Sequence, residues 1–332
     1  MRRQRRGLRA LALFVLAPYV GEFVLGNQPI TALLELPLLA TMYGGGAVLV
    51  REVGRRTRSG WPVMVLLAVA YALVEEGLVD QMLFNPAYLG LTSFADQAAV
   101  PGMGISARLT VDSVALHATG STCVPIALVE AFDRGAPRPW LGRRGLVAVA
   151  VVFVAGSAGL AVLQAVDLRF VGSPAQFAVT AAAVAGLIAL AVRRARQVVD
   201  DRRGPAGAVP RPRTVLLAAF GVTTGFWLLD LFLVPVAGAW VGVCCGAAVL
   251  AGGAVLLSRA SRRAGWGSQH RLAAACGALP TYLWLAPVNT AQLGIPPALG
   301  AAGNVVFGAS AVLLAVAAWR ADAHRRPVEA RV

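Results

Sequence analysis

The chain of 332 residues contains no lysine and little charge of any kind. Charged residues make up 14% of it, hydrophobic residues 58%, and the mean hydropathy is +0.68. Cysteine is also scarce: Cys123, Cys244, Cys245 and Cys276 all lie within apolar runs. None of them has CxxC or Cys/His spacing, so the sequence supports neither a disulfide framework nor a zinc knuckle. This composition is typical of a polytopic membrane protein.

All thirty basic residues are arginine, and the net charge is +14. In a soluble protein this excess would suggest nucleic-acid binding. Here the arginines fall between the apolar runs, where they act as topology signals and contact anionic lipid. We therefore expect the lipid bilayer, with anionic lipids at its cytoplasmic face, as the partner, and no nucleic acid. The absence of lysine, with abundant Ala, Gly and Val, indicates a GC-rich bacterium and hence a bacterial plasma membrane.

Ten apolar segments are long enough to cross a bilayer, which predicts an all-α, polytopic transmembrane bundle. The N-terminal stretch resembles a signal peptide, but no A-x-A site follows and the apolar run continues to Glu22. We therefore expect an uncleaved first transmembrane helix. The segments are 8–26, 29–50, 62–84, 108–132, 144–166, 174–194, 213–233, 237–259, 269–288 and 297–320.

The arginines assign the connections to two faces. Stretches 1–9, 51–60, 133–144, 193–213, 259–271 and 320–332 hold 5, 4, 4, 7, 4 and 4 arginines. Only Arg108 and Arg169 are left for the opposite face. By the positive-inside rule, both termini and the 193–213 loop are cytoplasmic.

The third segment contains three acids, Glu75, Glu76 and Asp80, within six residues. An ionised carboxylate near the bilayer centre costs about 2–3 kcal/mol on insertion scales. Sixteen acids in the whole chain make such a cluster unexpected by composition alone. We interpret this helix as the functional centre.

The depth of the polar side chains in the bilayer predicts which of them lie close together. Glu75 and Glu76 lie about 13 Å below the outer end of the third helix, and His117 lies about 13 Å below the outer end of the fourth. Glu22, near the outer end of the first helix, and Glu35, a turn or two into the second, share this outer half. We expect at least one of the paired glutamates to approach His117.

The acids divide the chain into two regions. Residues 1–135 form a four-helix membrane region that carries the acid and histidine cluster, and residues 136–332 form a six-helix scaffold whose only embedded acid is Asp230. The polar stretch 193–213 is a cytoplasmic hinge loop. The long outer connection 85–107 is either a lid or a plain connector.

Two carboxylates beside an imidazole can share a proton, activate water or hold a divalent cation, although nothing in the sequence requires a metal. The alternative is that the buried acids only fix helix packing. In an α-helix, adjacent residues point about 100° apart, so we expect one glutamate to face the site and the other to brace a neighbouring helix. Asp80 shares a face with Glu76, which favours Glu76 as the site residue.

Glu75-Glu76, and the HxxxS pattern of His117 and Ser121, resemble motifs of the CAAX-protease and bacteriocin-processing family of intramembrane proteases. That family carries EExxxR, FxxxH and HxxxN/D motifs, whose glutamate and histidine act on water. The resemblance implies a glutamate as general base and His117 as the group that orients or protonates.

This chain differs from that family at three motif positions: Asp80 or Gln81 replaces the arginine, Ser113 replaces the phenylalanine, and a second embedded histidine is missing. The family's site also opens toward the cytoplasm. The chain further resembles bacterial membrane proteins with an REx…WP…EEGL…LFNP pattern, which implies no activity. Three hypotheses stay open: a membrane-embedded hydrolase, an ion- or proton-coupled transporter, and a non-catalytic assembly partner.

The topology can be tested by cysteine labelling from the outer face of intact cells. We expect modification of a cysteine placed at Ser93, in the outer loop, and none at Ser261. Labelling at Ser261 would reverse the orientation and the depth argument with it.

Overall fold

The computed structural model describes residues 2–57, 59–86, 88, 98–133, 137–197 and 208–324. In this part of the chain, ten helical crossings coincide with the ten predicted segments. Eight of them are long and apolar enough to span a membrane. The other two are the fourth crossing, which is broken into three segments, and α11, which contains Pro280 and Pro287. The predicted all-α, polytopic bundle is confirmed.

The first four crossings are segmented, whereas the later ones are mostly continuous. The first four are α1 (Arg2–Pro18) with η1 (Tyr19–Val24), η2 (Ile30–Glu35) with α2 (Leu36–Arg56), α3 (Trp61–Leu73) with η3 (Val74–Val79), and α4 (Ala107–Ser113), η6 (Val114–Cys123) and α5 (Val124–Glu130) in line. The others are α6 (Arg143–Leu168), α7 (Pro174–Gln197), α8 (Pro212–Leu228) with η7 (Leu229–Leu233) and α9 (Val234–Ala237), α10 (Ala239–Ser261), α11 (Ser268–Gln292) and α12 (Pro297–Ala323).

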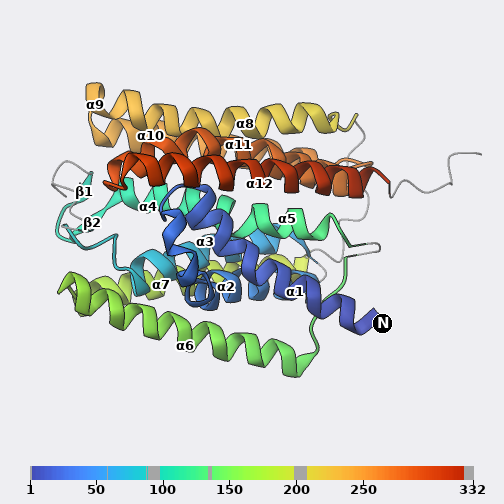
Figure 1. Ribbon diagram of the computed structural model, residues 1–332, viewed down its shortest axis with the longest axis horizontal. Coiled ribbons are helices and arrows are strands. Elements are labelled where there is room, and N and C mark those ends of the chain that lie inside the picture. The colour runs from blue at the N-terminus through green and yellow to red at the C-terminus, as the bar shows by residue number, and fades with distance from the viewer. Residues whose placement is uncertain are drawn as a thin grey trace, which may run out of the picture.

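The segmented crossings lie between two groups of later helices (Figure 1). On one side, α11 packs against α8 and α12, and α10 packs against α8. On the other side, α6 packs on α2 and α7 packs on α3. The predicted four-helix region is therefore flanked on both sides by helices of the predicted scaffold.

Both the start of α1 and the end of α12 lie at one end of the bundle, which we call the terminal face (Figure 1). The short antiparallel strands β1 (Ala99–Val100) and β2 (Ile105–Ser106) lie at the opposite end, the loop face. The assignment of the terminal face to the cytoplasm stays a prediction.

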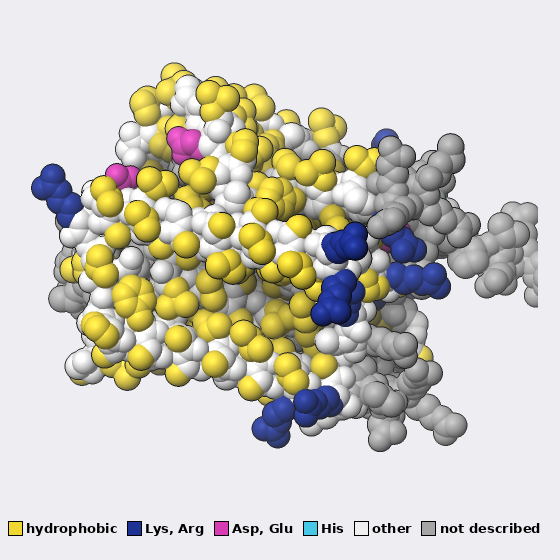
Figure 2. Space-filling model, turned by 90° about the horizontal axis from the view of Figure 1, so that it is seen from below, with side chains coloured by type: hydrophobic (Ala, Val, Ile, Leu, Met, Phe, Trp, Pro, Cys, Tyr) yellow, Lys and Arg dark blue, Asp and Glu magenta, His cyan; other side chains and the backbone are white. Residues whose placement is uncertain are grey.

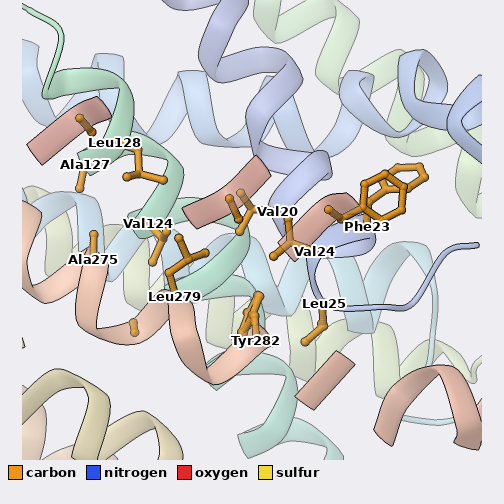
Figure 3. Packing of buried hydrophobic residues seen from close by; sticks show 14 of the residues in the cluster. Val20, Phe23, Val24, Leu25, Val124, Ala127, Leu128, Ala275, Leu279 and Tyr282 are labelled. Atoms are coloured by element: carbon orange, nitrogen blue, oxygen red, sulfur yellow. The ribbon is translucent and has the colours of Figure 1, made fainter. Parts of the chain in front are cut away.

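The core is apolar and has two parts. One lies where η1, α5, α11 and α12 meet, and Figure 3 shows Val20, Phe23 and Leu279 among its side chains. The other joins α1, α2 and α3 through residues such as Leu13, Met42 and Met64. These clusters hold the segmented crossings against one another and thereby fix the polar side chains that they carry.

The outer helices present apolar side chains to lipid. Only 6% of the most apolar stretch of α6 is buried, against 56% for the crossing formed by α3 and η3. Figure 2 shows hydrophobic side chains over most of the face on the side of α6, with most of the visible arginines toward the terminal face. This pattern is that of a membrane protein whose charged rim lies at the bilayer surface.

Close helix contact depends on glycine at Gly120 in η6. A Cβ at this position would overlap the hydroxyl group of Tyr282 on α11. Because that hydroxyl donates a hydrogen bond of 2.8 Å to the carbonyl oxygen of Leu116, the ring is anchored and cannot easily move aside.

We expect Gly120→Ala to destabilise the protein by about 1–3 kcal/mol through overpacking. Thermal unfolding of the purified protein measures this loss. Gly221→Ala, in α8, is the matched control because a Cβ there meets nothing within 4 Å. Equal melting temperatures for the two variants would contradict the packing described here.

Candidate functional site

His117 lies between the two adjacent glutamates of η3. Its Nε2 is 2.7 Å from Oε1 of Glu76, and its Nδ1 is 3.0 Å from Oε2 of Glu75. The hydroxyl of Ser121, one turn along η6, lies 3.3 Å from the same Nδ1. The predicted approach of a glutamate to His117 is confirmed. The prediction that only one glutamate would face the histidine is wrong, because both contact it.

The reason is the local helix geometry. Val74–Val79 is a π-helix, and the amide of Asp80 donates to the carbonyl oxygen of Glu75, five residues back, at 2.8 Å. A π-helix has more residues per turn than an α-helix, so adjacent side chains diverge less. The imidazole also presents two nitrogens on different edges of its ring. Together these features let one histidine contact both carboxylates.

Each π-helical segment carries an embedded titratable residue. In the described residues there are four such segments: η1 contains Glu22, η3 contains the two glutamates, η6 contains His117 and η7 contains Asp230. Single-turn π-bulges are uncommon and often occur at functional sites.

Glu22 joins the cluster through Tyr43, whose hydroxyl donates a hydrogen bond to Oε1 of Glu22. The Tyr43 ring lies 5.9 Å from the His117 ring, centroid to centroid. The exposed fractions are 7% for Glu22, 0% for Glu75, 5% for Glu76 and 4% for His117. The groups therefore form one buried site, closed to solvent in this conformation.

Tyr43 is the part of the site that the sequence analysis missed. Its hydroxyl is the only titratable group in the middle of the second crossing, between Glu35 and Arg51. The side chain of Tyr71, on α3, packs beside it with 6.4 Å between ring centroids. An isolated tyrosine in the middle of an otherwise apolar crossing was the available signal.

Two predicted members lie at different distances from the cluster. Asp80 is half-buried at the loop-face end of η3 and interacts electrostatically with Glu76 and Glu75. Its side chain forms no hydrogen bond or ion pair with any residue that the structure describes. Glu35 is exposed at the end of η2 and does not belong to the cluster.

Some carboxylate oxygens of the site have no donor. Oε1 of Glu75 and Oε2 of Glu76 are buried and form no hydrogen bond within the described ranges. No group of three or more His, Cys, Asp or Glu side chains in those ranges is arranged to hold a metal ion. A divalent metal stays one of the possibilities that the sequence leaves open.

A second polar layer lies toward the terminal face and ties helices together. Glu130, at the end of α5, accepts hydrogen bonds from Arg51, at 3.0 Å, and from Arg55. Glu52 pairs with Arg51 at 2.6 Å and accepts a bond of 2.8 Å from the amide of Trp140. Glu130 is thus ion-paired to two arginines of α2.

Asp133 makes a similar link. The sequence places it beside Arg134, which lies outside the described residues. In the structure Asp133 pairs with Arg9, on α1, at 2.6 Å and accepts a hydrogen bond of 2.9 Å from Nε1 of Trp140. The layer therefore joins the first, second and fourth crossings near the terminal face.

A third ion pair lies toward the loop face. Arg108, on α4, makes bidentate hydrogen bonds of 2.7 and 2.8 Å to Asp230, in η7. Asp230 is the acid that the sequence analysis assigned to the membrane interior of the last six crossings. The bridge connects the crossing that carries His117 to the later helices.

The described part of the 85–107 connection packs at the loop face. Of the 85–107 connection, residues 87 and 89–97 lie outside the described residues, so the choice between lid and connector stays open. Strands β1 and β2 follow, and the amide of Ser106 donates to the carbonyl oxygen of Leu83 at 3.1 Å. Gln176, on α7, donates to the carbonyl oxygens of Met103 and Gly104.

Comparison with models of known protein families, with curated proteins and with solved structures found nothing that matches this chain. The interpretation of the site therefore rests on its geometry and on the sequence.

We expect His117→Leu to destabilise the protein by about 3–5 kcal/mol, because it leaves two buried carboxyl groups without their shared partner. Adding Glu75→Leu and Glu76→Leu to this variant should recover most of the loss, since no unpaired charge then remains. Thermal unfolding of the single and triple variants measures both effects. Glu35→Leu, at an exposed position, is the control. A triple variant less stable than His117→Leu would contradict the pairing.

Proposed function

We propose that this polytopic membrane protein is a proton-coupled transporter whose proton-binding site is the cluster of Glu75, Glu76 and His117. The observation that carries the proposal is the position of His117 between two carboxylates in a buried site. Chains of Asp, Glu and His inside membrane bundles serve as proton relays in pumps and transporters.

The chemistry of the site favours binding and release of protons. An imidazolium between two carboxylates can pass a proton to either side, and each glutamate still has an oxygen without a donor. Glu22, bonded to Tyr43, adds a third carboxyl group within the same buried cluster. Proton exchange requires only small movements, whereas entry of a larger substrate would require the site to open.

The surroundings favour exchange with the loop face. Asp80 is half-buried at the end of η3 and lies between the cluster and that face. Toward the terminal face, residues 124–129 of α5 are buried and entirely apolar. With the loop face outside, as the arginine distribution predicts, protons would be taken up from outside the cell.

A hydrolase is the second candidate. The hydrogen-bonded series Ser121, His117 and Glu76 favours it, together with the resemblance to intramembrane proteases. A general base, however, needs a ring nitrogen or a carboxylate oxygen within reach of the proton that it removes. Here both nitrogens of His117 already contact carboxylates, and the carboxylate oxygens without a donor are buried. Water or a substrate could reach them only if the site opened, which favours the transporter.

Charge displacement on a solid-supported membrane tests the proposal without knowledge of the transported solute. We expect an outer pH jump applied to reconstituted wild-type protein to give a transient current, because protons move part of the way into the bilayer. Glu76→Gln and His117→Gln should lose this current. Glu35→Gln should keep it, since that glutamate is exposed and outside the cluster.

Equal currents from all four proteins would overturn the proposal. The proposal would also be overturned if His117→Gln and Glu76→Gln kept the current while Ser121→Ala lost cellular function. That result would favour the hydrolase. Size-exclusion profiles and melting temperatures show that each variant is folded before its current is compared.

A further inference from the structure

Tyr282, on α11, places its hydroxyl group inside the backbone hydrogen-bond ladder of η6. The hydroxyl donates a hydrogen bond of 2.8 Å to the carbonyl oxygen of Leu116. It also forms a hydrogen bond with the backbone of Gly120, whose N–H group is the donor because the hydroxyl proton is already used. In a regular α-helix the amide of Gly120 would itself donate to the carbonyl of Leu116, four residues back. The hydroxyl therefore takes the place of one helical hydrogen bond.

This insertion gives a physical reason for the π-helical form of η6. A side chain that enters the ladder holds the two backbone groups apart, so the turn between them must widen. η6 extends over ten residues, whereas the other three π-helical segments in the described ranges have five or six. Gly120 permits the insertion, because a Cβ at this position would overlap the hydroxyl.

The turn that the hydroxyl opens is the one that carries His117, which lies between the two bonded backbone groups. The direction of its imidazole therefore depends on whether this turn is π-helical or α-helical. In the π-helical form its two ring nitrogens lie 2.7 Å from Glu76 and 3.0 Å from Glu75. Glu22 and Glu75 also act electrostatically on Tyr282, so its hydroxyl is close enough to sense the cluster.

Packing holds Tyr282 in this position. The residue is only 5% exposed and belongs to the core cluster that joins η1, α5, α11 and α12, where Figure 3 shows it. Further along α11, Asn289 donates a hydrogen bond of 3.1 Å to the carbonyl oxygen of Leu25, just after η1. Thus α11 is fixed against η1, which carries Glu22, and against η6, which carries His117. It supplies none of the cluster's carboxyl or imidazole groups itself, yet it contacts the backbone that directs them.

We infer that Tyr282 is a positioning residue of the histidine cluster. Its hydroxyl keeps η6 open between residues 116 and 120, and the open turn directs His117 toward both glutamates. Without the hydroxyl, the two backbone groups bond to each other, the turn closes and the imidazole rotates away from one carboxylate. The inference rests on the proposed function only where a proton current is measured, because the contacts of His117 are the same whatever the site transports.

Tyr282→Phe tests the inference, because it removes the hydroxyl and keeps the ring in the core. The contacts of His117 can be followed by solid-state NMR of the full-length protein in liposomes, with ¹⁵N-labelled histidine. The chain has three histidines, and the signals that His117→Gln removes are those of His117. We expect Tyr282→Phe to shift the signal of one ring nitrogen of His117 toward that of a nitrogen without a carboxylate partner. The signals of His270 and His324 should not move.

Tyr19→Phe is the matched control. It also removes one hydroxyl, which shares a hydrogen bond with Ser310, from a ring packed against the same core cluster. A loss of packing or stability alone would affect both variants, whereas only Tyr282→Phe should change the His117 signals. Gly120→Ala is a second test from the opposite helix, because its Cβ displaces the same hydroxyl. It should shift the same signal, so either variant decides the question if the other does not fold.

The proton current gives the second measurement. We expect Tyr282→Phe to lower the pH of half-maximal current by about one unit, as for loss of one hydrogen bond to a charged group. Unchanged His117 signals in the folded variants would overturn the inference. An unchanged midpoint would also overturn it where the wild-type protein gives a current. Shifted His117 signals without any current from the wild-type protein would support the inference and overturn the proposed function instead.

Discussion

The low dielectric of the bilayer interior is the constraint on which this structure depends, because an embedded charge there must meet a partner. The chain satisfies this constraint in three places along the helices. His117 lies between Glu75 and Glu76, Arg108 pairs with Asp230, and Arg51 pairs with Glu130. In each place the partners come from different crossings. The ion pairs therefore determine which helices lie together, and the apolar clusters fill the space between them.

Much of this organisation follows from the sequence, because hydropathy and charge are local properties. The apolar segments of spanning length predicted all ten crossings. The helical rise per residue predicted that the glutamates and His117 lie at equal depth. The hydrogen bond between Glu22 and Tyr43 could not be predicted from the sequence. It depends on which faces of the first and second crossings meet, and that is decided by packing at residues such as Gly44, where a Cβ would overlap the backbone of Phe14.

One prediction failed for reasons of local backbone geometry. The assumption of a regular α-helix separated Glu75 from Glu76, whereas the π-helical segment brings both to one imidazole. Glu35 lies a turn or two into the second crossing, as expected, but in a 3₁₀ segment that precedes α2. Pro37 was a usable signal there, since proline favours the first turn of a helix. The sequence contains no comparable signal for a π-helix.

Under the proposed function, the fourth crossing is the element that links proton binding to the rest of the bundle. It carries His117 in η6 and Glu130 at the end of α5, and thus takes part in both the site and the ion-pair layer near the terminal face. Protonation that weakens the contacts between His117 and the glutamates of η3 would change the forces on η6. That segment is already π-helical rather than α-helical. Because the helix between the two polar layers is tightly packed, a shift of η6 would be passed along it to Glu130. Glu130 would then move against Arg51 and Arg55, on the second crossing. The apolar residues between the layers keep protons from following the same route, so that movement and proton flow stay separate.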